Sequence, residues 1–536
     1  MIATLTLAVM AGATLAATPC EGLKTISLPN TTITTSEFIP EGPQQLPARG
    51  GGGAAAPRGD GAGRGQAPGA PQGGAPAAAG ARGDGGARGG GGGRGGGQPQ
   101  ILPAHCRVVA VLKPTPDSLI NMELWLPAAD KWNGKYLSVG NGGWAGSIQG
   151  LTNGMPAALR AGYATAGNDT GHEGGNGTFA LGHPEKLVDF AYRAMHEMTV
   201  QSKALVKTFY DRSATLSYYN GCSTGGRQGL MAAQRYPEDF DAIIAGAPAN
   251  EHTYMHGGDI SRMTDIYKDP EGFIPEAKQS MLAKAVMNAC DANDGVKDNL
   301  ITNPPSCKFD PAVLQCKSGD APDCLTAKQV ATAKRLYQDA KTSKGVLIFP
   351  GYPYGGETAY TVMRGGTAPG NLQVDTYKLA HNDANWDWKT FNLETDPALA
   401  KSKIGFIDST NPDMTAFKNR GGKLILYHGW ADPAIQAGHT IVYYDSVLAK
   451  MGKSQDNWMR LYMVPGMGHC GGGSGPNQID WLGALETWRE KGQAPNVVGR
   501  GTNDGAAMTR PLCPHPQVAT FKGSGDVNDA ANFVCK

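Results

Sequence analysis

The stretch that decides the fold covers residues 218–237 and reads YYNGCSTGGRQGLMAAQRYP. A β-like run leads into the pentapeptide GCSTG, which has the pattern Gly-x-Ser-x-Gly around Ser223, and a helix-like run follows it. Glycines two residues before and after a serine tolerate a strained backbone and let neighbouring elements approach closely. The start of the following helix places positive dipole beside an oxyanion. The stretch therefore predicts a strand-to-helix turn that presents Ser223 as a nucleophile.

A serine hydroxyl needs a base to take its proton, and the base needs an acid to orient it. Asp432 follows the strand-like run KLILYHGWA, and His469 follows MRLYMVPGMG. This order of serine, acid and histidine, each after a strand, is that of α/β-hydrolases. His428 lies inside its strand and His439 in the helix expected after Asp432, so both are interpreted as structural. The alternatives are that Asp432 caps a helix before Pro433 and that His469 is an ordinary loop histidine.

Strand-like and helix-like runs alternate along most of the chain, which is typical of an α/β protein with a mostly parallel sheet. The strand-like runs include CRVVAVLKP, INMELWLP, GKYLSVGNGG, GYATAGND, LSYYNG and DAIIAGAP, and a helix is expected over 184–210. The alternation stops between 250 and 420. We therefore expect a catalytic domain in two parts, 99–249 and 421–536, with 250–420 inserted as a lid domain. Residues 18–48, which contain the β-like run TISLPNTTITTSEF, are assigned to the catalytic domain as its N-terminal segment.

Two segments near the N-terminus differ in composition from the rest. Residues 1–17 combine an apolar stretch too short to span a bilayer with small residues suited to cleavage, so they are interpreted as a secretory signal. An N-terminal core helix is the alternative. Residues 49–98 are mostly Gly, Ala, Pro and Arg without an aromatic residue, so we expect them to be disordered.

The Gly/Arg-rich segment suggests two kinds of partner that the rest of the chain argues against. Its two Arg-Gly-Asp triplets, at 58–60 and 82–84, are interpreted as chance in so biased a composition. An RNA-binding tail conflicts with the secretory signal and with the lack of aromatic residues for base stacking. A formal net charge of +1 gives no basis for attracting nucleic acid or an anionic membrane. We expect a secreted or periplasmic protein without a membrane span or a nucleic-acid partner, and its oligomeric state stays open.

The ten cysteines are an even number without a C-x-x-C pair, which favours disulfides over a zinc or thioredoxin-type centre. Their spacing suggests the near pairs Cys290–Cys307, Cys316–Cys324 and Cys513–Cys535. Cys222 precedes Ser223 and Cys470 follows His469, so a serine that meets its histidine brings these cysteines within disulfide reach. The alternative, Cys222 as a thiol nucleophile, requires a reducing compartment and leaves Ser223 unexplained.

The run CDANDGVKDNLI places Asp291, Asp294 and Asp298 in one short loop, with Gly295 at a sharp turn. Three close carboxylates repel one another unless a cation lies among them, and oxygen ligands suit Ca²⁺. The spacing matches an EF-hand only loosely, so the pattern by itself favours a solvated acidic loop.

The cysteine-flanked serine and histidine resemble those of the tannase and feruloyl esterase family, which also includes bacterial mono(2-hydroxyethyl) terephthalate hydrolases. The matching segments are GCSTGGRQGL, YHGWADPAI, TIVYYDSV, VPGMGHCGGG, GNGGWAGS, CDANDGVKDNLI and NWDWKTFNLETD. They cover nearly the whole chain except the signal and residues 49–98. The resemblance implies an α/β-hydrolase in which Ser223 is the nucleophile, His469 the base and Asp432 the orienting acid.

The resemblance also implies the Cys222–Cys470 disulfide, a Cys20–Cys106 disulfide and the three near pairs. It implies that the backbone N–H of Thr224 donates to the oxyanion, with a second donor from Gly142 or Gly143. Structural Ca²⁺ is expected on the carboxylates of Asp291, Asp294 and Asp298 and on the carbonyls of Val296 and Leu300. No organic cofactor is expected.

These features predict a secreted serine carboxylic ester hydrolase that cleaves esters of aromatic, feruloyl-type acids through an acyl-enzyme. The aromatic residues Tyr352, Tyr354, Trp386, Trp388 and Phe391 are candidates for a wall around the acyl group, or else form the lid's own core. Galloyl esters are the next alternative. Terephthalate monoesters require a cationic group in the lid, where the run TYKLAHNDA offers only Lys378. A catalytically inactive binding protein is the alternative from another class.

Overall fold

The computed structural model describes residues 18–44, 46, 99–152, 154–365, 369–503 and 505–536. The predicted signal at 1–17 and the predicted disordered segment at 49–98 lie outside the described residues. Within the described ranges, no helix has both the length and the apolar character needed to cross a membrane.

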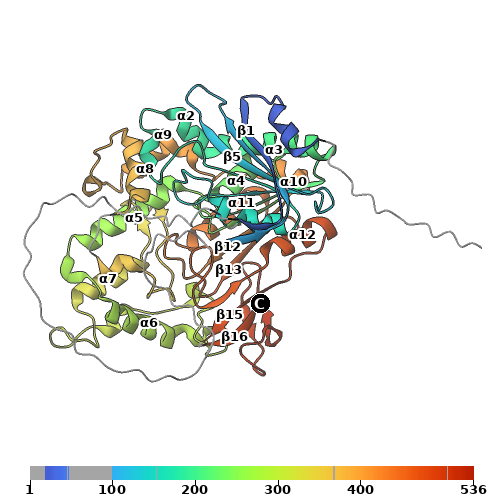
Figure 1. The fold of residues 1–536 in the computed structure, drawn as a ribbon. Coiled ribbons are helices and arrows are strands. Elements are labelled where there is room, and N and C mark those ends of the chain that lie inside the picture. Colours follow the sequence, from blue (N-terminus) through green and yellow to red (C-terminus); the bar gives the residue numbers. More distant parts are fainter. Residues whose placement is uncertain (1–17, 45, 47–98, 153, 366–368, 504) are drawn as a thin grey trace, which may run out of the picture.

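A nine-stranded mixed sheet forms the centre of the molecule (Figure 1). Its order is β1-β4-β5-β7-β6-β8-β9-β12-β13. The strands are β1 (Thr31–Ile39), β4 (His105–Leu112), β5 (Ile120–Pro127), β6 (Lys135–Val139), β7 (Ala164–Asn168), β8 (Leu216–Cys222), β9 (Ala242–Gly246), β12 (Lys423–Gly429) and β13 (Met459–Val464). Neighbours from β7 to β13 are parallel, whereas the pairs β1·β4, β4·β5 and β5·β7 are antiparallel. The predicted parallel sheet is therefore confirmed, with an antiparallel edge that the sequence pattern did not indicate.

Both faces of the sheet are buried, which explains why its central strands are almost entirely apolar. Adjacent residues of a strand point to opposite faces, so Tyr219 packs in one core cluster and Tyr218 in another. The first cluster includes side chains of three helices, α3 (Ala194–Tyr210), α4 (Thr224–Arg235) and α11 (Gly438–Met451). The second includes side chains of α1 (Gly154–Arg160) and α12 (Trp481–Lys491). The sheet thus lies between two helical layers.

The chain reverses its direction of travel through the sheet at β6. It proceeds from β6 to β7 on one side and returns to place β8 on the other side. The return passes through α2 (Pro184–Val188), a π-helical turn (Asp189–Arg193) and α3, which together occupy the predicted helix 184–210. In open α/β sheets such a switch point leaves a crevice at the carboxyl ends of the strands. The loops that follow β6 and β8 meet there.

The described residues of the insertion, 250–365 and 369–420, add no strand to the large sheet, as the loss of alternation in the sequence predicted. Their main helices are α5 (His252–Tyr267), α6 (Glu276–Cys290), α7 (Ala327–Tyr337), α8 (Asn371–His381), α9 (Asp396–Ile404) and α10 (Thr415–Asn419). Figure 1 shows α5, α6, α7 and α8 grouped on one side of the sheet. This helical insertion has a hydrophobic cluster of its own, which includes Ile266, Leu282 and Leu336. Its role as a lid stays a prediction.

Five disulfides tie these parts together: Cys20–Cys106, Cys222–Cys470, Cys290–Cys307, Cys316–Cys324 and Cys513–Cys535. They are the pairs expected from the sequence. The first joins the N-terminal segment to β4, beside which β1 forms the edge of the sheet. After β13 the chain forms a small antiparallel sheet of β14 (Gly475–Gln478), β15 (Val497–Asn503) and β16 (Ala506–Leu512), which the sequence analysis did not predict.

Candidate active site

Ser223 lies on the sharp turn between β8 and α4. Its φ of 64° and ψ of −126° form a conformation that non-glycine residues rarely adopt. A Cβ added at Gly221 would lie 2.6 Å from the carbonyl oxygen of Gly225, so only glycine fits there. The amide of Ser223 donates to Gly246 (3.0 Å), and its carbonyl accepts from the amide of Ala249 (3.1 Å). The turn is therefore held in its strained form by the loop that follows β9.

Asp432 and His469 are hydrogen-bonded to each other. The Nδ1 of His469 donates to the Oδ2 of Asp432 at 2.7 Å, which leaves its Nε2 for another partner. Asp432 is 1% exposed. Burial disfavours the charged carboxylate, but the hydrogen bonds from His428 and His469 outweigh it and hold the pKa of Asp432 below its ordinary value. Asp432 is therefore ionised at neutral pH and able to orient an imidazole. It does not cap α11, which begins at Gly438.

The Cys222–Cys470 disulfide brings the serine turn and the histidine loop together. Their strands, β8 and β13, are not neighbours, because β9 and β12 lie between them. The disulfide spans 248 residues of sequence and holds the two Cα atoms 5.9 Å apart. It joins the residue before Ser223 to the residue after His469, so it fixes the nucleophile candidate beside the base candidate.

The glycine-rich loop after β6 is attached to the serine turn. The hydroxyl of Thr224 donates to the carbonyl oxygen of Gly143 at 2.7 Å. The amide of Gly142 donates to Oε1 of Gln149 at 2.6 Å, so it already has an acceptor. In the part of the chain that the structure describes, no acceptor is bonded to the amide of Gly143 or Thr224. Of the two glycines predicted as oxyanion donors, Gly143 is the one with a free N–H.

His428 contacts the carboxylate of Asp432, a contact that its interpretation as a structural histidine inside a strand did not include. Its Nε2 lies 3.0 Å from Oδ2 of Asp432, and its Nδ1 lies 2.7 Å from Oγ1 of Thr440. The spacing in His-Gly-Trp-Ala-Asp at the end of β12 was the available signal. Sequence reasoning missed the contact because it depends on a turn that brings residue i+4 back to the strand end.

The three aspartates of the acidic loop are buried rather than solvated. Asp291 accepts from the amides of Asp298 and Leu300, and Asp294 accepts from the amide of Val296 and the hydroxyl of Thr302. Burial raises the pKa of Asp294 and raises that of Asp298 to about 6. The burial of the three aspartates argues against the interpretation of this segment as a solvated acidic loop.

Asp298 is the member of this loop whose partners are incomplete. Its Oδ2 accepts from Arg510 at 2.5 Å, and its Oδ1 is buried without a hydrogen-bond partner among the described residues. A buried, unpartnered carboxylate oxygen fits a hard cation such as Ca²⁺. Within the described residues, however, no three His, Cys, Asp or Glu side chains gather closely enough to form a metal cluster. The calcium site therefore stays a prediction.

The aromatic residues predicted to surround a substrate pack mainly within the helical insertion. Trp386 is 9% exposed and stacks on Tyr377 and His381, both at 5.5 Å between ring centroids. Phe391 packs edge-on against Tyr377, Trp388 packs edge-on against Tyr267, and Tyr354 lies against Tyr337. These contacts support the alternative that the residues form the insertion's own core, and contact with substrate stays a prediction.

Tyr352 also packs in the insertion, against Tyr360, and in addition makes a contact outside it. Its hydroxyl donates to the carbonyl oxygen of Pro433 at 3.2 Å. Tyr352 therefore reaches from the insertion to the turn that carries Asp432.

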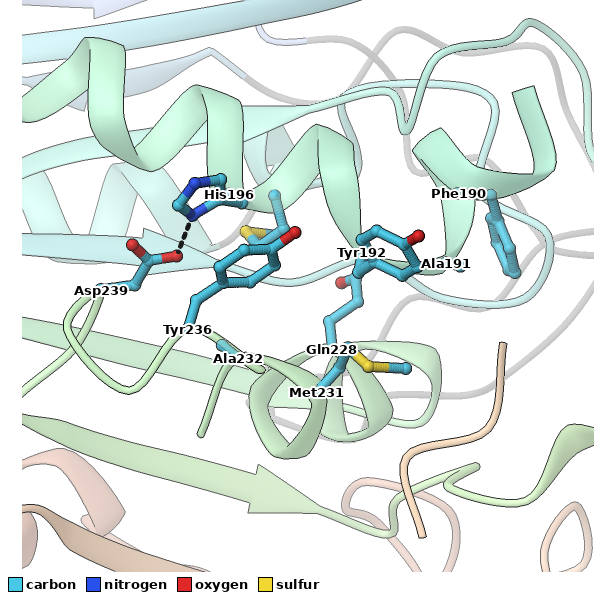
Figure 2. Close-up of a pocket in the computed structure, with 10 residues that line it drawn as sticks. Phe190, Ala191, Tyr192, His196, Gln228, Met231, Ala232, Tyr236 and Asp239 are labelled. Carbon is cyan, nitrogen blue, oxygen red and sulfur yellow. Dashed lines mark hydrogen bonds and ion pairs between the residues drawn. The ribbon is translucent and has the colours of Figure 1, made fainter. Parts of the chain in front are cut away.

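Two small hollows lie near the sheet, and neither is lined by Ser223 or His469. Figure 2 shows the first, where His196 donates to Asp239 at 2.9 Å beside Tyr192 and Tyr236. The second is lined by Leu300, Trp430 and Gly466, among others, and so joins the acidic loop to the turns before Asp432 and His469.

The sequence and the fold are similar to those of known proteins. Residues 106–536 match the family described as tannase and feruloyl esterase. An uncharacterized esterase from Xanthomonas campestris is 36% identical over 490 residues, which cover 81% of this chain and 84% of that protein. A probable feruloyl esterase B-2 from Aspergillus terreus is 33% identical over 459 residues, which cover 80% of this chain and 86% of that protein. The crystal structure of feruloyl esterase B from Aspergillus oryzae superposes with a TM-score of 0.83 at 28% identity, covering 96% of this chain and 99% of that one.

Proposed function

The chain belongs to the tannase and feruloyl esterase family, and from this premise we propose that it is a serine esterase that hydrolyses esters of aromatic acids. As a member it is a carboxylic ester hydrolase, and its α/β-hydrolase fold matches that of feruloyl esterase B from Aspergillus oryzae. One observation carries the serine mechanism: a disulfide joins the residue before Ser223 to the residue after His469.

In the proposed mechanism, Nε2 of His469 takes the hydroxyl proton of Ser223 as the serine oxygen attacks the ester carbonyl. The ionised Asp432 stabilises the imidazolium that forms. The amides of Thr224 and Gly143 donate to the oxyanion. His469 then protonates the departing alcohol, and water activated by the same histidine releases the acid from the acyl-enzyme.

We propose feruloyl-type, hydroxycinnamic esters as the substrates, since several relatives bear the name feruloyl esterase. Galloyl esters are the alternative, because the family description includes tannase. Terephthalate monoesters are less well supported. The Nζ of Lys378 lies 3.7 Å from Oδ1 of the buried Asp375, so this lysine already has a carboxylate beside it.

The decisive test compares the parent with Ser223→Ala on methyl ferulate, methyl gallate and mono(2-hydroxyethyl) terephthalate. We expect methyl ferulate to be the best substrate and the variant to lose turnover. Ser217→Ala in β8 is the matched control. A fluorophosphonate probe should label the parent and not Ser223→Ala. Unchanged turnover by Ser223→Ala would exclude the proposed nucleophile, and an unlabelled, inactive parent would favour the alternative of a binding protein.

We further propose that structural Ca²⁺ binds the carboxylates of Asp291, Asp294 and Asp298 and the carbonyls of Val296 and Leu300. The unpartnered Oδ1 of Asp298 supports this site. Metal analysis should find about one calcium per chain, and Asp298→Asn should lose it. A calcium-free parent that melts at the same temperature with and without added Ca²⁺ would exclude the site.

The compartment is proposed to be oxidising, either outside the cell or in the periplasm. Five disulfides without a free cysteine in the described residues support this location. The predicted signal at 1–17 is consistent with it. Detection of the mature chain in the culture medium or periplasmic extract tests this point.

A further inference from the structure

We propose that His428 is a positioning residue for the proposed catalytic acid, Asp432. Its imidazole donates a hydrogen bond to Oδ2 of Asp432, the same oxygen that orients His469. The inference rests on the proposed function, because it assigns His428 a role through Asp432 and His469. His428 itself touches neither the nucleophile nor the substrate in this proposal.

The carboxylate of Asp432 is fully occupied by donors. Its Oδ2 accepts from Nδ1 of His469 at 2.7 Å and from Nε2 of His428 at 3.0 Å. Its Oδ1 accepts from the amides of Ala434 at 2.7 Å and Ile435 at 3.0 Å. An ionised carboxylate offers about four lone-pair directions, so these four donors leave it no other orientation. His428 supplies one of the two donors to Oδ2, the oxygen that also accepts from His469.

The surroundings of His428 determine which ring nitrogen carries the proton. Its Nε2 faces two groups that only accept, the carboxylate of Asp432 and the carbonyl of Ile435 at 3.1 Å, so it carries a hydrogen. Its Nδ1 faces the hydroxyl of Thr440, which donates to a neutral ring and accepts from a charged one. His428 therefore donates to Asp432 in either protonation state.

Burial and position make this donor rigid. The His428 side chain is 0% exposed, and its residue lies on β12, which is paired on both sides with β9 and β13. Thr440, which holds the other side of the ring, lies on α11. A donor held by an interior strand and a packed helix has few alternative rotamers, so it positions Asp432 without an entropy cost in each turnover.

A second N–H on Oδ2 withdraws charge from the oxygen that His469 also uses. Without His428, more of the carboxylate charge is concentrated on the hydrogen bond to His469, so removing His428 should change the pH dependence of activity. Four titratable groups from other elements face this pair: His439 of α11, Asp259 of α5, and Tyr352 and Tyr360 of the insertion. Burial lowers the pKa of His439 to about 3, so that ring is neutral at working pH.

The proposal is tested with His428→Phe, which keeps an aromatic ring and removes the donor. We expect kcat to fall about 10-fold with little change in KM, because orientation in the transition state is lost while binding is kept. We also expect the acid limb of the kcat/KM profile to shift by about half a pH unit or more. A His428→Phe enzyme with the parent profile and rate would overturn the proposal.

Rescue separates this role from a merely structural one. His428→Gln offers an amide N–H near the position of Nε2, so it should recover most of kcat and return the acid limb toward its parent position. His439→Phe is the matched control, since His439 is also buried but packs against Phe349 in a tilted arrangement and makes no hydrogen bond to Asp432 among the described residues. It should leave the acid limb in place. An equal shift in His439→Phe would overturn the proposal.

Thr440→Val decides the question if His428→Phe does not fold. The hydroxyl holds the imidazole in place through Nδ1, so its loss should loosen the ring and lower kcat with little change in KM, and Thr440→Ser should restore kcat. An unchanged kcat in Thr440→Val would overturn the proposal. Each of these comparisons is made only after Ser223→Ala has been shown to lose the activity of the parent. Failure of the proposed function is therefore recognised separately from failure of the role of His428.

Discussion

Asp432 and Glu357 are both buried carboxylates that accept several hydrogen bonds, yet their pKa values move in opposite directions. Asp432, in the turn after β12, is 1% exposed and has two imidazole donors and two amide donors. Glu357, in the helical insertion, is 2% exposed and accepts from the amide of Gly355 and the hydroxyl of Tyr337. Burial raises the pKa of Glu357 to about 7, whereas the donors of Asp432 outweigh burial.

The difference shows what keeps a buried acid charged. One backbone amide and one phenol do not replace the hydration that Glu357 loses. Two histidines and two amides do so for Asp432. The turn after β12 thus pre-organises a charge on Asp432, and the insertion keeps an acid that is neutral over part of the physiological range.

The largest expected effect comes from removing the charge at the catalytic site. Asp432→Asn should lower kcat by about 10³–10⁴-fold with the fold intact, because His469 loses the acceptor that fixes its tautomer. Glu357→Gln is the matched carboxylate-to-amide control and should retain parent kcat. Steady-state kinetics and circular dichroism of both variants test the contrast, which fails if the two lose activity equally.

A smaller effect is expected from releasing the histidine loop. The double variant Cys222→Ala/Cys470→Ala should lose about 10²-fold in kcat, since a displaced base costs roughly that much. Cys316→Ala/Cys324→Ala removes a disulfide of the insertion whose cysteines are 8 residues apart in sequence. This variant should keep kcat near the parent value. The expectation is contradicted if loss of the Cys316–Cys324 disulfide lowers kcat more than loss of the Cys222–Cys470 disulfide.

The smallest effect concerns stability at Glu357. Its folded pKa lies above the ordinary value of 4.5, so the folded state binds the proton more tightly, and stability falls as pH rises from about 4.5 to about 7. Glu357→Gln should therefore raise the free energy of unfolding by about 1–3 kcal/mol at pH 7.5 and change it little at pH 4. Denaturant titrations at the two pH values measure this, and equal effects at both would contradict the assignment.

Local patterns in the sequence were sufficient for much of the sheet. Each apolar run that was predicted as a strand, from CRVVAVLKP to MRLYMVPGMGHC, forms a strand of the large sheet. The strained turn at Ser223 followed from the Gly-x-Ser-x-Gly pattern. The antiparallel edge β1-β4-β5 could not be predicted, because strand direction depends on connections through space and the residues of β4 and β5 fit either direction.

Contacts between distant segments could not be predicted from local patterns in the sequence. Whether Gly142 or Gly143 has a free amide depends on Gln149 turning back onto the loop. The aromatic run around Trp386 was ambiguous, because an indole suits a core and a binding wall equally, and only packing against Tyr377 favours the core.

By itself, the sequence determined which residues are candidates for ester hydrolysis, because side-chain type, turn glycines and hydrophobic periodicity are local properties. Only the tertiary structure decided that Oδ2 of Asp432 is shared by two histidines and that Glu357 is buried with too few donors. Both outcomes depend on side-chain directions at the meeting point of several elements. Such directions are set by packing and desolvation, which no stretch of sequence contains alone.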